Sequence, residues 1–96
     1  MRSSNEYTLK EALEAYINKF DRFGKFKRAA IVNAWEHEMG PIIKKHTKSI
    51  YVKGDKLFVY LSSPAIKNEL LMARSKIVKA LNDKVGQQVI TEIIIR

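Results

Sequence analysis

Hydrophobic and polar positions alternate most clearly over residues 50–61, on either side of Gly54 and Asp55. A Gly-X pair between two runs of β-branched and aromatic residues predicts a type II′ turn that joins two antiparallel strands. In this register Tyr51 lies opposite Phe58. Side chains alternate across a strand, so the hairpin has one aliphatic and one aromatic-basic face. The aliphatic face collects Ile50, Val52, Leu57, Val59 and Leu61, and the other collects Tyr51, Lys53, Lys56, Phe58 and Tyr60.

The N-terminal part of the chain has helical periodicity. Residues 1–7 are polar, and we expect them to be flexible. Apolar residues then recur at steps of three and four over 8–23, which predicts an amphipathic helix. Thr8 and Glu11 fit a capping box at its start, and Gly24 is placed to end it in a left-handed conformation.

A second helix is predicted over 25–39, with an apolar stripe that includes Trp35. The indole is large and has a single donor, so we expect it to anchor the core. Gly40 and Pro41 interrupt this helix, because proline cannot continue the preceding hydrogen-bond ladder but readily starts a new turn.

After the hairpin, Ser63 as N-cap and Pro64 at the first helical position predict a third helix. Its apolar stripe continues without a break, so we expect one helix that frays around 82–84 and ends before Gly86. Residues 89–96 are strongly β-branched and predict a third strand.

The predicted order is helix, helix, strand, strand, helix, strand, which indicates an α+β fold in a single domain over residues 8–96. Helices on one face of a three-stranded sheet would cover the aliphatic side and leave the aromatic side open. The sequence leaves undetermined which edge the third strand joins.

Composition narrows the class of protein. The chain is 46% hydrophobic and has only four glycines and two prolines, which is typical of a globular domain. It has no cysteine, which excludes disulfides and fits a cytoplasmic location. No segment approaches the roughly 20 apolar residues that span a bilayer, so we expect no membrane insertion. The net charge of +8 favours polyanionic partners such as nucleic acid.

The sequence offers little for catalysis. His37 and His46 have no metal-ligand spacing, and the second histidine of a zinc-protease motif is replaced by Pro41. The four glycines fall at element boundaries rather than in a phosphate-binding loop. We therefore expect no enzymatic activity, no metal and no cofactor.

Basic residues gather in several segments, and the hypothesis they favour is binding of single- or double-stranded DNA through phosphate contacts. The alternative for each cluster is a solvated surface. The candidate nucleic-acid-binding residues are Lys19, Arg22, Lys25, Lys27, Arg28, Lys44, Lys45, Lys48, Lys53, Lys56 and Arg74.

The aromatic face of the hairpin has two interpretations. Tyr51, Phe58 and Tyr60 on an open sheet resemble a platform on which bases stack. The same rings, with Ile94 from the third strand, also suit docking of a partner protein or of a second copy of the chain, which would make a homodimer. The sequence does not separate these two uses.

From residue 4 to residue 96 the chain resembles short members of the DciA-like family (DUF721). The resemblance lies in the order and spacing of several short segments rather than in a catalytic signature. These are residues 9–12 (LKEA), 35–40 (WEHEMG), 45–47 (KHT), 50–53 (IYVK), 57–63 (LFVYLSS), 69–70 (EL) and 92–96 (EIIIR).

This resemblance implies a KH-like fold in a bacterial cytoplasmic protein that helps to place the replicative helicase on DNA. The partners it implies are the helicase and DNA. Two features of the chain differ from those of KH domains and of longer family members. The chain lacks the Gly-x-x-Gly loop with which KH domains grip a nucleic-acid backbone, and it has no extension after Arg96 like that of longer relatives. The alternative is a non-enzymatic protein-interaction module that does not bind nucleic acid.

Overall fold

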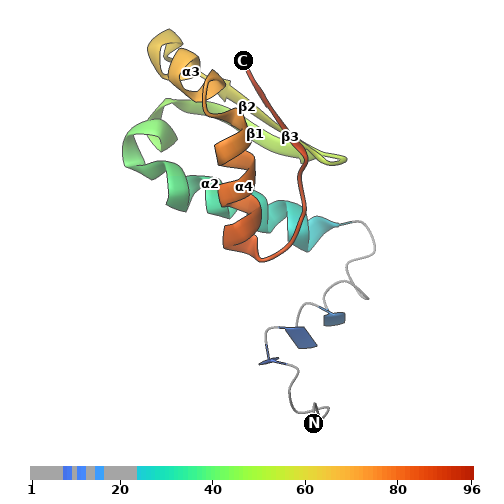
Figure 1. Cartoon of the computed structure of the whole chain (residues 1–96). Helices are drawn as coiled ribbons and strands as arrows, with labels where there is room; N and C mark the ends of the chain where they lie inside the picture. Colours follow the sequence, from blue (N-terminus) through green and yellow to red (C-terminus); the bar gives the residue numbers. More distant parts are fainter. Residues whose placement is uncertain (1–7, 10, 13–14, 17–23) are drawn as a thin grey trace.

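The computed structural model describes residues 8–9, 11–12, 15–16 and 24–96 (Figure 1). The predicted flexible segment 1–7 and most of the predicted helix 8–23 lie outside these residues. At the start of that helix the Glu11 N–H donates to the Thr8 hydroxyl at 3.0 Å, which is one half of the predicted capping box. Gly24 has a left-handed φ of 69°, as expected.

The described chain forms three helices and a three-stranded mixed sheet, so the α+β prediction is confirmed. The elements are α2 (Lys25–His46), β1 (Thr47–Lys53), β2 (Lys56–Leu61), α3 (Pro64–Leu71), α4 (Arg74–Val85) and β3 (Glu92–Ile95).

The hairpin has the predicted register. β1 and β2 are antiparallel, with Tyr51 opposite Phe58 and Lys53 opposite Lys56. Gly54 has a φ of 63° and no described non-glycine residue has a positive φ, as a type II′ turn requires. β3 joins the other edge of β2 in parallel, which makes β2 the central strand.

The helices cover one face of this sheet (Figure 1). α2 and α4 pack against each other, α2 also contacts β1, and α4 contacts β3. The aliphatic face of the hairpin supplies Leu57 and Val59 to the core, both with no exposed surface. The remaining buried hydrophobic residues are Ile31, Ala34, Trp35, Leu70, Ile77, Leu81, Ile90, Ile93 and Ile95.

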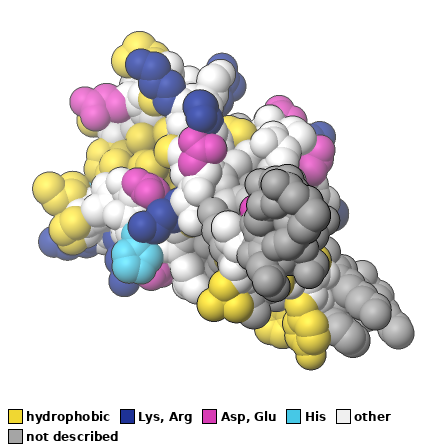
Figure 2. Space-filling model, turned by 60° about the horizontal axis from the view of Figure 1, so that its bottom comes forward, with side chains coloured by type: hydrophobic (Ala, Val, Ile, Leu, Met, Phe, Trp, Pro, Cys, Tyr) yellow, Lys and Arg dark blue, Asp and Glu magenta, His cyan; other side chains and the backbone are white. Residues whose placement is uncertain are grey.

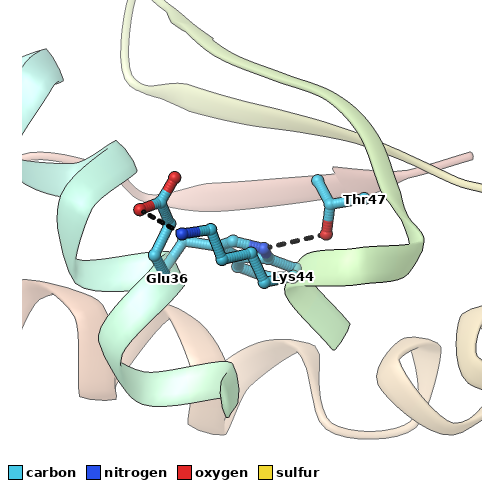
Figure 3. Close-up of polar contacts among 4 residues, drawn as sticks. Glu36, Lys44 and Thr47 are labelled. Carbon is cyan, nitrogen blue, oxygen red and sulfur yellow. Dashed lines mark hydrogen bonds and ion pairs between the residues drawn. The ribbon is translucent and has the colours of Figure 1, made fainter. Parts of the chain in front are cut away.

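A kink divides α2. Gly40 takes a φ of 83° and a ψ of 174°, and Pro41 follows it, so the predicted interruption is confirmed. Lys44, after the kink, forms an ion pair of 3.4 Å with Glu36, before it (Figure 3). Figure 3 also shows, beside this pair, the hydrogen bond that the Trp35 indole donates to the Thr47 hydroxyl. Contacts therefore join the two halves of the helix directly.

The prediction of one continuous third helix is wrong, because this segment forms two helices, α3 and α4. Ser63 caps α3 as expected, accepting a hydrogen bond from the Ile66 N–H at 3.3 Å. The chain then turns at Met72 and Ala73, where Ala73 has a φ of −113°. No glycine or proline marks this break. Its physical reason is packing, since α3 contacts only the sheet strands β2 and β3 among the main contacts of the described elements, whereas α4 packs on α2 as well as on β3.

The end of α4 also differs from the prediction, because residues 82–84 do not fray. Asn82 is only 5% exposed, and its side chain fixes the segment that leads to β3. Its amide nitrogen donates to the Ile90 carbonyl at 2.8 Å, while its oxygen accepts from the N–H groups of Val89 at 2.9 Å and Ile90 at 3.1 Å. These bonds replace the strand pairing that was predicted from residue 89, so β3 begins only at Glu92.

A second connection ties the hairpin turn to the start of β3. The Thr91 N–H donates to the carbonyl oxygen of Asp55 at 2.8 Å. The Thr91 hydroxyl also donates to the Asp55 carboxylate at 2.8 Å. The turn is therefore held by a residue 36 positions further along the chain.

Candidate nucleic-acid and partner interface

The open sheet face carries an aromatic centre. Tyr51 and Phe58 are directly opposed on β1 and β2, and Ile94 of β3 lies opposite Phe58 on its other side. Tyr51 is 42% exposed, and Phe58, Ile94 and Tyr60 are half-buried. The structure therefore brings together all four residues of the candidate partner face in one continuous patch.

The rings of this patch stack on one another. The ring centroids of Tyr51 and Phe58 are 5.0 Å apart with an interplanar angle of 11°. Those of Tyr51 and Tyr60 are 6.3 Å apart at 20°. Ring faces that stack within the protein leave less aromatic surface for a nucleotide base, which favours docking of apolar side chains.

Hydrogen bonding with Tyr60 is the main cause that raises the pKa of the Tyr51 phenol, and desolvation and the charge interaction with Tyr60 raise it further. The positive charge of Arg96 acts on this pKa in the opposite direction. Arg96 thus belongs to the electrostatic environment of the aromatic patch, although the sequence did not single it out as a site residue.

Charged side chains flank the aromatic patch at the hairpin tip. Lys53 and Lys56 are exposed and directly opposed across the two strands. Lys56 also lies opposite Glu92 on β3, with 3.7 Å between its ammonium nitrogen and the carboxylate. One of the two candidate lysines is therefore partly neutralised by a neighbour.

The remaining basic candidates do not form a single patch. Lys25, Lys27 and Arg28 lie at the start of α2, whereas Lys44 and Lys45 lie in its last turn and Lys48 on β1. Helix α2 has 22 residues, so at 1.5 Å per residue its two ends are roughly 30 Å apart before the kink is considered. Lys19 and Arg22 fall outside the described residues.

Figure 2 shows one face of the molecule, on which Lys and Arg side chains are interspersed with acidic and hydrophobic ones. Lys79 on α4 donates to the Asp83 carboxylate at 2.8 Å, so this lysine is paired with an acidic neighbour on the same helix. The basic surface is thus divided into separate groups.

The corner between α3 and α4 is a feature that the sequence analysis missed. Met72 is 84% exposed there, and Arg74 follows at the start of α4. This corner is part of the connection between β2 and β3. This corner was not predicted because no glycine or proline in the sequence marks the break between the two helices.

Among the described residues, no group of three His, Cys, Asp or Glu side chains is placed to hold a metal ion. His46 instead lies 3.1 Å from the Ser62 hydroxyl through its Nδ1 atom. None of the described helices is long and apolar enough to cross a membrane.

The residues that carried the family resemblance now have structural roles. Trp35 and Glu36 contact residues beyond the kink of α2, Gly40 forms the kink, and Thr47 receives the indole hydrogen bond. These contacts set the shape of α2 and its junction with β1.

Comparison with known proteins gives a family. Residues 8–95 match the model of a family described as "Dna[CI] antecedent, DciA". A "UPF0232 protein" of Corynebacterium glutamicum (strain R) is 34% identical over 87 residues, covering 86% of this chain. The chain spans about half the length of that relative, 49% of it. No solved structure matches. Because the family match extends over nearly the whole chain, this protein belongs to the DciA family.

Proposed function

We propose that this chain is a DNA-binding accessory protein of bacterial DNA replication that helps to place the replicative helicase. The observation that carries the proposal is membership of the DciA family over residues 8–95, because this family is associated with replication and helicase loading. The net charge of +8 supports a polyanionic ligand.

In this proposal DNA is held by separated groups of basic side chains. Lysines and arginines that neutralise phosphates release counterions, so binding is independent of sequence and weakens as salt increases. Lys53 and Lys56 at the hairpin tip are the best-defined pair, because a closed turn fixes their positions. The other groups are the candidates on α2, β1 and α4: Lys25, Lys27, Arg28, Lys44, Lys45, Lys48 and Arg74.

The aromatic patch serves a protein partner in this proposal. Its rings already stack on one another, and Ile94 extends the patch with aliphatic surface that cannot stack on bases in the same way. Basic groups around an apolar centre then suit a partner with apolar side chains flanked by carboxylates. The replicative helicase is the partner that family membership supports.

Fluorescence anisotropy with labelled single- and double-stranded DNA tests the nucleic-acid part. Between about 50 and about 200 mM salt we expect affinity to fall by about 10³ if six phosphates are contacted. Lys53→Gln should weaken binding and reduce the salt slope by about one. Lys79→Gln is the matched control, since Lys79 is paired with Asp83. Absence of binding at the lower salt would refute DNA binding.

Substitution of Tyr51 separates the two uses of the aromatic patch. If bases stack there, Tyr51→Ala should weaken single-stranded DNA binding by about 1–3 kcal/mol while Tyr51→Phe retains it. If a protein docks there, Tyr60→Asp should abolish capture by purified replicative helicase and leave DNA affinity nearly unchanged. The second result is the one we expect.

The second candidate function is a protein-interaction module that does not bind nucleic acid. The self-stacked aromatic patch and the dispersed basic groups favour it. It predicts that purified helicase is captured by the wild-type chain while anisotropy detects no DNA binding at low salt.

A further inference from the structure

The two edge strands of the sheet differ in their protection against pairing with another strand. Edge strands of natural proteins are usually blunted by lysine, proline or a bulge. β1 carries Lys48 and Lys53, and its register is irregular between Thr47 and Ser49. β3 has the sequence Glu-Ile-Ile-Ile, without a lysine, a proline or a register irregularity. Strand addition is therefore favoured at β3.

The backbone groups of β3 point alternately toward β2 and away from it. The Arg96 N–H donates to the Val59 carbonyl oxygen at 2.9 Å, and the Arg96 carbonyl accepts from the Leu61 N–H at 2.8 Å. By alternation, the N–H and C=O groups of Ile93 and Ile95 point away from β2.

None of the described residues bonds these outward groups. A row of unpaired N–H and C=O groups at the edge of a sheet is a template for pairing with another strand. The unpaired N–H and C=O groups of Ile93 and Ile95 therefore favour the addition of a strand that supplies the missing donors and acceptors.

The space beside this edge is a groove. It has a volume of about 380 Å³ and lies between the start of α4 and β3. Its lining consists of Arg74, Ser75, Val78, Thr91, Glu92 and Ile93. The start of α4 therefore leaves space beside residues 91–93, where this edge begins.

We propose that β3 pairs antiparallel with β3 of a second copy of this chain, about a two-fold axis at Ile94. Ile93 and Ile95 would form the hydrogen-bonded pairs and Ile94 the intervening non-hydrogen-bonded pair. Glu92 then lies opposite Arg96 of the partner subunit, and Arg96 opposite Glu92 of the partner subunit. The segment 92–96 (EIIIR) is thus complementary in charge to its own antiparallel copy.

Charge also distinguishes this dimer from one made by the open faces. On the described strands, the open side carries Lys53, Lys56 and Arg96 but one acidic residue, Glu92, so two open faces would bring like charges together. Edge pairing instead joins the two sheets side by side into six strands and merges the two aromatic patches. This inference does not rest on the proposed role in replication.

Charge reversal at the two ends of β3 tests the register. Because only a short edge is paired, we expect a dimer that dissociates at about micromolar concentration or above. Glu92→Arg and Arg96→Glu should each weaken dimerisation about tenfold or more, measured by sedimentation velocity over a range of concentrations. The double variant should restore it.

Lys53→Glu is the control for the charge-reversal series, because it changes a charge on the same open side but at the β1 edge, and it should leave the dimer intact. A wild-type chain that is monomeric at every concentration would overturn the proposal. A dimer that is unaffected by both single reversals would do the same.

Cross-linking provides a second test. The chain has no cysteine, so Ile94→Cys introduces a single thiol at the two-fold axis. A non-hydrogen-bonded antiparallel pair places its Cα atoms about 4.5 Å apart, within the range for a disulfide. Ile94→Cys should form a covalent dimer rapidly under mild oxidation, whereas Ser49→Cys on β1 should remain largely monomeric. Equal rates for the two variants would overturn the β3 pairing.

Discussion

The indole N–H of Trp35 donates a hydrogen bond to the Thr47 hydroxyl at 3.2 Å, and that hydroxyl in turn donates to the Ile43 carbonyl at 2.7 Å. This relay joins α2 before its kink, α2 after its kink and the first residue of β1. Trp35 is only 1% exposed, so its donor depends on Thr47 rather than on water. The hydrogen bond therefore fixes the position of the hairpin relative to the helix.

We expect Thr47→Val to lower the free energy of unfolding by about 1–3 kcal/mol, because it leaves a buried donor and a helix-end carbonyl unpaired at nearly constant volume. Urea denaturation measures this change. Thr91→Val is the matched control, since its hydroxyl bonds an exposed carboxylate, and it should cost less than about 0.5 kcal/mol. Equal costs would show that the indole bond contributes nothing.

Gly40→Ala should destabilise the protein by about 1–3 kcal/mol, because its backbone lies in a region that is essentially restricted to glycine. No atom lies within 4 Å of a Cβ placed there, so this cost is conformational rather than steric. Gly86 has a φ of 84° and a ψ of 13°, a left-handed conformation that asparagine tolerates. Thermal denaturation should therefore show Gly86→Asn to be milder than Gly40→Asn.

Asn82→Ala should lower the free energy of unfolding by about 2–4 kcal/mol, because it removes the partners of three backbone groups near Ile90. Hydrogen exchange at the Val89 and Ile90 amides should accelerate in parallel. Asn68→Ala on the exposed side of α3 provides the control and should change neither quantity appreciably. If both variants unfolded alike, the amide would not secure this segment.

The raised pKa of Tyr51 predicts a pH dependence at the alkaline end. A phenol whose folded pKa lies above its unfolded value stabilises the fold in its neutral form. This contribution is complete below the unfolded pKa and is lost as pH rises through the folded one. NMR titration of the Tyr51 ring should show its pKa falling in Tyr60→Phe, which removes the main cause. An unchanged pKa would contradict that assignment.

The sequence predicted correctly those elements that depend on residues close together in the chain. The hairpin register followed from Gly54 and from strict alternation, and the start of α3 from Ser63 and Pro64. The break at Met72 was not predictable in this way, because no residue there disfavours a helix and packing on α2 imposes it. The same holds for Asn82, whose polar side chain is buried only because three non-local backbone groups surround it.

The sequence predicted the aromatic patch of the candidate site, but it did not predict how the basic residues are distributed in space. Strand periodicity placed Tyr51, Phe58, Tyr60 and Ile94 on one face, as the sheet register confirms. The basic candidates were grouped by their proximity in sequence, whereas folding distributes them over both ends of α2, β1, the hairpin tip and α4. The ion pair of Lys56 also depends on a partner distant in sequence, Glu92 on β3.

The bonds between Asp55 and Thr91 have a consequence for the energetics of binding. A free hairpin tip would have to be immobilised by its ligand, and the lost backbone freedom would subtract from the affinity. Here Thr91, directly before β3, has already immobilised the turn before any ligand arrives. Lys53 and Lys56 are therefore preorganised, and a ligand that contacts them has only to order the ends of two side chains.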